Sequence, residues 1–140
     1  MVSLLFAASS LAYNTWRNET SELHRNWRQA AFDLTHEVNE LQQIVLYRRY
    51  FHTRSDEPVR GPSDADTWIR GWGKAAGVRD LTSVLPEPLP KQGVQLHAAW
   101  QEHAGDLDAD GELAQTAEHE LLDAIDAVRG SVLGLIQELR

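Results

Sequence analysis

The sequence predicts an all-α protein, in which one very long N-terminal helix packs with a long C-terminal helix and one or two shorter helices in a three- or four-helix bundle. Residues 1–57 contain neither proline nor glycine, the residues that most often end a helix. Apolar residues recur at spacings of three and four in both long segments, as on one face of a helix. No segment keeps the strict alternation typical of a strand.

Composition limits both the number of domains and the chemistry. A chain of 140 residues is expected to form a single domain with one core. The chain contains no cysteine, which excludes disulfides, thiolate metal sites and thiol catalysis. The sequence also contains no glycine-rich phosphate loop and no HExxH zinc motif.

The first helix is expected to run to about residue 52. Its apolar or small residues form a heptad-like stripe with one four-residue stutter before Val38. We call this stripe the seam; it consists of Tyr13, Trp16, Thr20, Leu23, Trp27, Ala30, Leu34, Val38, Leu41 and Val45. A helix of this length spans about 75 Å, whereas a compact chain of this size is only about 35 to 40 Å across. About half of the helix is therefore expected to project from its own domain.

A polar connection is expected at residues 53–66, followed by a short helical region at 67–85. Three glycines are expected to weaken this second region, namely Gly71, Gly73 and Gly77. The sequence PEPLP at 86–90 predicts an extended turn that stops it.

The remaining chain predicts two more helices. The helix at 92–104 is expected to bury Val94, Leu96 or His97, and Trp100. The helix at 111–139 repeats the long apolar stripe and is the natural antiparallel partner of the first helix. Its stripe consists of Ala117, Leu121, Ile125, Val128, Val132, Leu135 and Leu139.

Residues 1–16 carry no charged side chain, and three interpretations compete for them. A transmembrane anchor is favoured by Tyr13 and Trp16, which suit a membrane interface, and by the arginines that follow, which place the helical domain in the cytoplasm. Against it, residues 2–16 cover only about 22 Å of a hydrocarbon core of about 30 Å. A signal peptide is suggested by the small residues Ser10 and Ala12, but no basic segment precedes the apolar core.

The third interpretation is an oligomerisation or partner-binding helix. The phase of the seam continues without a break into the N-terminal segment, and coiled-coil helices pair through such stripes. The residues expected at this contact are Tyr13, Trp16, Leu23, Trp27 and Leu34.

The stretch from Tyr13 to Glu19, YNTWRNE, closes an apolar helix and opens an amphipathic one. In this respect the chain resembles small uncharacterised bacterial inner-membrane proteins that have one N-terminal anchor helix and a helical soluble domain. The resemblance covers about a tenth of the chain. It implies membrane association, with the helical domain in the cytoplasm, and it implies no site residue.

A short acidic segment is the sharpest pattern for a metal. Asp106, Asp108, Asp110 and Glu112 surround Gly111 in a sequence that resembles the start of an EF-hand calcium loop. The twelfth position of that loop, normally a bidentate Glu, is Ala117. The alternative is an acidic turn that caps the last helix, so calcium stays a hypothesis and no other cofactor is expected.

Helical spacing also groups His36 with Glu40, and Glu120 with Asp123. Antiparallel packing of the two long helices could bring these pairs together as the metal site of an all-α enzyme, although such pairs are common on polar helix faces. Between Glu102 and Asp126 there are nine acidic residues and no Lys or Arg. This charge argues against nucleic acid as a partner.

These observations predict a non-enzymatic helical interaction or sensor module that is membrane-anchored or self-associating. The alternative is a metal-dependent helical enzyme or a calcium-responsive switch. The expected partner is a second copy or another protein, bound through the first helix. The tryptophans at positions 68, 72 and 100 are expected to lie in the core.

Overall fold

The computed structural model describes residues 2–51 and 64–139, and helices are the only regular secondary structure within them. The elements are α1 (Val2–Tyr50), α2 (Asp64–Thr82), α3 (Leu89–His103), the short 3₁₀-helix η1 (Ala104–Asp108) and α4 (Gly111–Glu138). No strand occurs in these two ranges, so the predicted all-α class is confirmed. Most of the connection predicted at 53–66 lies outside the described residues.

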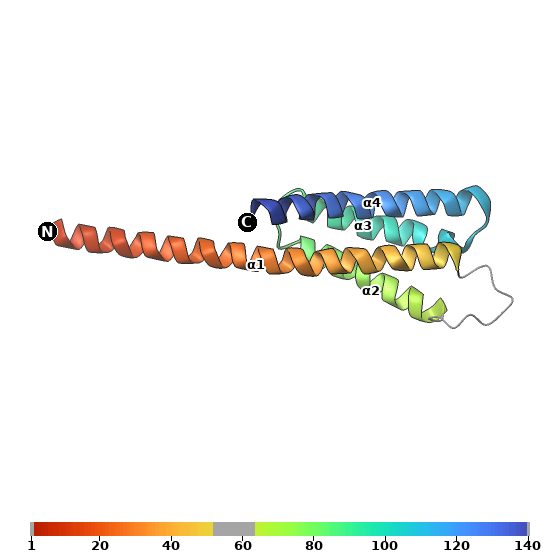
Figure 1. The fold of residues 1–140 in the computed structure, drawn as a ribbon, viewed down its shortest axis with the longest axis horizontal. Helices are drawn as coiled ribbons and strands as arrows, with labels where there is room; N and C mark the ends of the chain where they lie inside the picture. The colour runs from red at the N-terminus through yellow and green to blue at the C-terminus, as the bar shows by residue number, and fades with distance from the viewer. Residues whose placement is uncertain (1, 52–63, 140) are drawn as a thin grey trace.

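The helices form a bundle in which α1 lies beside α2 and α4 (Figure 1). Helix α3 also lies beside α2 and α4, and among the described residues its backbone is not adjacent to that of α1, so these two helices are diagonal. Helix α4 runs antiparallel to α1, because Arg49 pairs with Glu118 near one end and Arg28 donates to the Leu139 carbonyl near the other. The predicted pairing of the two long helices is therefore confirmed.

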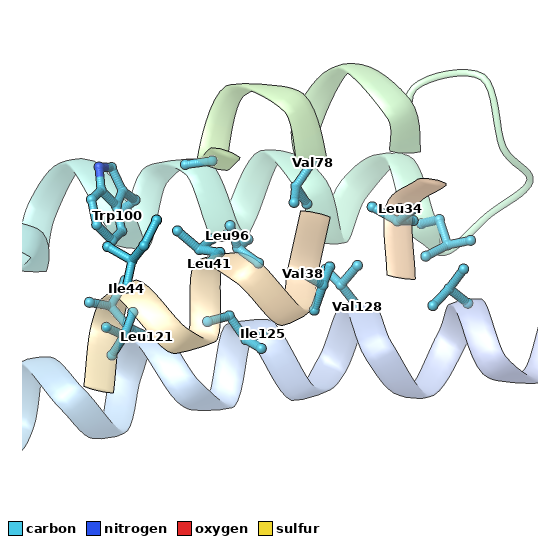
Figure 2. Packing of buried hydrophobic residues seen from close by; sticks show 14 of the residues in the cluster. Leu34, Val38, Leu41, Ile44, Val78, Leu96, Trp100, Leu121, Ile125 and Val128 are labelled. Carbon is cyan, nitrogen blue, oxygen red and sulfur yellow. The ribbon is translucent and has the colours of Figure 1, made fainter. Parts of the chain in front are cut away.

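The core lies where the apolar faces of the four helices meet (Figure 2). Leu34, Val38, Leu41 and Val45 of the α1 seam have no exposed surface. Opposite them lie Leu121, Ile125 and Val128 of α4, with Val78 of α2 and Leu96 and Trp100 of α3 completing the cluster.

Two glycines allow α2 and α3 to approach closely. A Cβ atom added at Gly71 would lie 2.2 Å from the Trp100 ring, and one added at Gly93 would lie 1.8 Å from Thr82 Oγ1. The helical region predicted at 67–85 is present as one continuous helix, α2, although it contains three glycines. Gly71 is a packing position, because only a residue without a side chain leaves room for the buried indole.

Helix α3 differs from its prediction in two ways. It begins at Leu89, within the predicted extended turn, because a proline such as Pro90 is tolerated in the first turn, where the missing N–H has no intrahelical acceptor. Val94, predicted to be buried, is 58% exposed. Of the three tryptophans expected in the core, Trp100 is buried and Trp72 half-buried, whereas Trp68 lies at the surface.

The N-terminal half of α1 projects beyond the bundle with no other described helix beside it (Figure 1). Arg28 marks the level at which α4 ends, through its contact with Leu139. We call residues 2–26 the arm, which is about 37 Å long at the usual helical rise. The projection predicted from the length of the helix is thus present.

Candidate interaction surface

The arm continues the seam of α1, but there the seam is exposed. Tyr13 is 59% exposed, Trp16 62% and Leu23 46%. Further along the helix, the seam residues from Leu34 onward are completely buried in the bundle. One apolar stripe is therefore covered over half of its length and uncovered over the other half.

The change from covered to uncovered occurs at Trp27 and Ala30. Both are partly buried and pack against the edge of the core. Helix α1 shows no interruption at this point. The exposed seam therefore lies in line with the core and extends it beyond the end of the bundle.

Aromatic side chains contact each other at two places along the described part of the exposed seam. The rings of Tyr13 and Trp16 lie 6.2 Å apart between centroids, and His24 stacks on Trp27 at 5.9 Å. The hydroxyl of Thr20, the polar member of the seam, donates to the Trp16 carbonyl at 2.9 Å. Because this donor already has an acceptor, burying Thr20 in an interface leaves no hydroxyl proton unpaired.

Charge differs between the arm and the rest of the chain. Residues 1–28 carry three Arg and two Glu, whereas residues 29–140 carry ten Lys or Arg and 19 Asp or Glu. Residues 1–28, which include the arm, are thus almost neutral, and the excess acidic charge lies in the rest of the chain. Two arms can approach each other without strong repulsion.

The acidic residues of the predicted calcium loop lie around the junction of η1 and α4. Asp106 and Asp108 lie on η1, Asp110 precedes α4, and Glu112 lies in its first turn. Among the described residues, no group of three or more His, Cys, Asp or Glu side chains is placed to hold a metal ion. The Asp108 carboxylate instead accepts a hydrogen bond from Arg48. The geometry therefore gives the calcium hypothesis no support.

Arg48 is a site that the sequence does not indicate. It is only 3% exposed, it donates to Thr67 Oγ1 at 3.2 Å, and it lies 5.1 Å from the Trp68 ring centroid. Together with the Asp108 contact, these interactions join α1, α2 and η1. A buried guanidinium held in this way fixes the packing of the three elements.

The His and acidic pairs of the two long helices lie in separate networks. Lys74 of α2 binds Glu37 at 2.9 Å and Glu40 at 2.7 Å. These hydrogen bonds lower the pKa of the Glu40 carboxyl and raise the pKa of Lys74. His36 pairs with Glu40 along α1. On α4, Asp123 pairs with His119 at 3.2 Å. Within the described part of the chain, His36 and Glu40 therefore do not join the acidic pair Glu120 and Asp123 in a group that could hold a metal ion.

A shallow groove of about 640 Å³ lies between the end of α1 and the start of α4. At its edge the Tyr50 hydroxyl donates to Glu118 at 2.8 Å, and this hydrogen bond raises the pKa of Tyr50. Arg49 binds the same carboxylate at 3.2 Å. The polar groups of the groove thus hold α1 and α4 together.

The structure does not support the expected transmembrane helix. None of the helices in the two described ranges contains a stretch long and apolar enough to span a bilayer.

No protein-family model, curated protein sequence or solved structure is significantly similar to this chain. The resemblance to bacterial inner-membrane proteins stays a prediction. Within the described residues, the exposed seam at Tyr13, Trp16 and Leu23 is an apolar surface without a neighbouring helix.

Proposed function

We propose that this protein is a self-associating helical interaction module, in which the arm binds the arm of a second copy. The observation that carries this proposal is the single seam of α1, which is buried from Leu34 onward and exposed at Tyr13, Trp16 and Leu23. The buried half shows that the stripe suits helix packing, and the exposed half lacks such a neighbour among the described residues.

The arm needs a partner for physical reasons. Helices in proteins obtain most of their stability from packing an apolar face, and a helical segment without such packing is marginal in water. Burying the exposed apolar surface of the large side chains on the arm lowers the free energy by roughly 25 cal/mol per Å². A neighbouring helix on the seam supplies both effects.

A second copy suits this surface because the surface is complementary to itself. Heptad stripes pair with stripes of the same spacing through knobs-into-holes packing. The arm also carries nearly balanced charge, so two identical arms do not repel each other strongly. The acidic bundle remains outside the contact.

Trp16→Asp tests the proposal, with Asn18→Asp as a matched control. Both changes add one negative charge to exposed positions of the arm, but only Trp16 lies on the seam. Light scattering should give the wild type and Asn18→Asp twice the chain mass of 15.8 kDa, and Trp16→Asp the mass of one chain. The melting curve of the Trp16→Asp monomer should still show a folded bundle, because the arm lies outside the core.

A wild-type protein that is monomeric at every concentration would refute self-association. Co-sedimentation with phosphatidylglycerol vesicles tests the alternative that the arm binds a lipid surface instead of a second copy. A wild-type monomer that binds these vesicles, and loses binding on Trp16→Asp, would assign the seam to a lipid surface.

A further inference from the structure

We infer that the two arms pair antiparallel about a two-fold axis, with Tyr13 of each copy against Trp16 of the other. The inference rests on the proposed self-association and defines its geometry. It follows from how the bundle closes one end of the arm, from the distribution of charge and from the pattern of residues along the seam.

The bundle itself excludes parallel pairing. Helix α1 is continuous to Tyr50, so a parallel partner lying on the seam would run on to the level of Leu34 and beyond. At that level the seam is already buried against α2 and α4. An antiparallel partner directs its own bundle away from the first bundle, so the two bundles do not compete for the same space.

The distribution of charge also favours antiparallel pairing of the arms. Residues 29–140 carry nine more acidic than basic side chains, and parallel arms would place two such bundles in contact. Antiparallel arms place them at opposite ends, with the two Leu34 positions about 60 Å apart along the helix axis. At that distance, salt at physiological concentration screens the repulsion, because the Debye length is only about 8 Å.

The register follows from matching the layers of the seam. When Tyr13 faces Trp16 of the second copy, Ser9 faces Thr20, so aromatic residues meet aromatic residues and small polar residues meet each other. Shifting the pairing by one heptad in either direction places Tyr13 or Trp16 against a hydroxyl-bearing residue, Ser9 or Thr20. A shifted register therefore packs an aromatic ring against a small polar side chain, which covers less apolar surface than a pair of aromatic rings.

The residues beside the seam are compatible with this register. Arg17 lies across from Ser10 of the second copy, and Glu19 lies across from Ala12. All four positions are exposed in the single chain. No like charges face each other along the proposed contact, so electrostatics does not oppose the pairing.

Engineered cysteines can test this geometry because the chain contains no native cysteine. Ser9→Cys and Thr20→Cys are prepared separately, refolded together as a mixture and oxidised. Only the mixed pair should form a disulfide-linked dimer, since the proposed register brings position 9 beside position 20. Equal positions of the two copies lie about 16 Å apart, which is beyond the reach of a disulfide.

Asn18→Cys, on the opposite face of the arm, is the matched control and should not couple to Ser9→Cys. Self-coupling of Ser9→Cys together with self-coupling of Thr20→Cys would show parallel arms and overturn the inference while leaving self-association intact. A protein that is monomeric by light scattering and forms no crosslink would overturn the proposed function itself. A dimer in which no cysteine couples would also refute the arm register.

Discussion

Gly93→Ala tests the close packing of α2 against α3. The added methyl group would lie 1.8 Å from Thr82 Oγ1 and 2.9 Å from Thr82 Cβ. Thr82 has no exposed surface, and its hydroxyl donates to the Arg79 carbonyl at 2.9 Å. Moving this side chain therefore disturbs both the packing and a hydrogen bond. Overpacking of this kind costs up to about 3 kcal/mol.

The better helix propensity of alanine offsets about 1 kcal/mol of this cost. We therefore expect Gly93→Ala to lower the free energy of unfolding by about 2 kcal/mol. With a urea m-value of about 2 kcal/mol per M, the unfolding midpoint falls by about 1 M.

Gly130→Ala is the matched control for Gly93→Ala, because an alanine Cβ at Gly130 would meet no described atom within 4 Å. This variant should be more stable than the wild type by about 0.5 to 1 kcal/mol. Adding Thr82→Ala to Gly93→Ala removes the closest overlap and should recover part of the loss. Urea unfolding followed by circular dichroism measures all of these variants. A Gly93→Ala protein as stable as Gly130→Ala would refute the packing argument.

Two electrostatic predictions concern the bundle. Arg48→Met should lower the free energy of unfolding, measured in urea, by about 3 kcal/mol, because it leaves the partly buried Asp108 carboxylate without its cation. The control Arg79→Met removes an exposed pair and should lower it by less than about 1 kcal/mol. Equal losses in the two variants would contradict the role given to Arg48. Lys74 lowers the pKa of Glu40 below 4.5, so Glu40 stabilises the fold above that pH, and this contribution is lost as the pH falls through its folded-state pKa. The difference in melting temperature between wild type and Lys74→Met should therefore shrink from about pH 7 to about pH 3, and a constant difference would contradict it.

The sequence predicts the long helices well because their limits depend on local signals. The last helix is predicted at 111–139 and found at Gly111–Glu138, and the first is predicted to about 52 and found to end at Tyr50. Comparing the length of the first helix with the diameter of a compact domain also predicts that part of the seam lies in the bundle and part extends beyond it. Heptad spacing and the absence of breakers suffice for both conclusions.

Features that depend on the neighbouring helix are not predictable in the same way. Gly71 indicates a weakened helix by its sequence alone, and only the position of Trp100 shows that its missing side chain is needed. Arg48 has a charge typical of surface residues, yet it lies in the interior with Thr67 and Asp108. Helical periodicity shows which face is apolar but does not identify the partner atoms on that face.

The central claim is that the arm is covered by a second copy of the chain. Amide hydrogen exchange at different protein concentrations tests it most directly, because an uncovered arm opens easily whereas a paired arm opens only after dissociation. We expect protection of residues 9–26 to rise with protein concentration, while protection of the bundle segment 34–45 stays constant. Fast exchange in residues 9–26 at every concentration would contradict the claim.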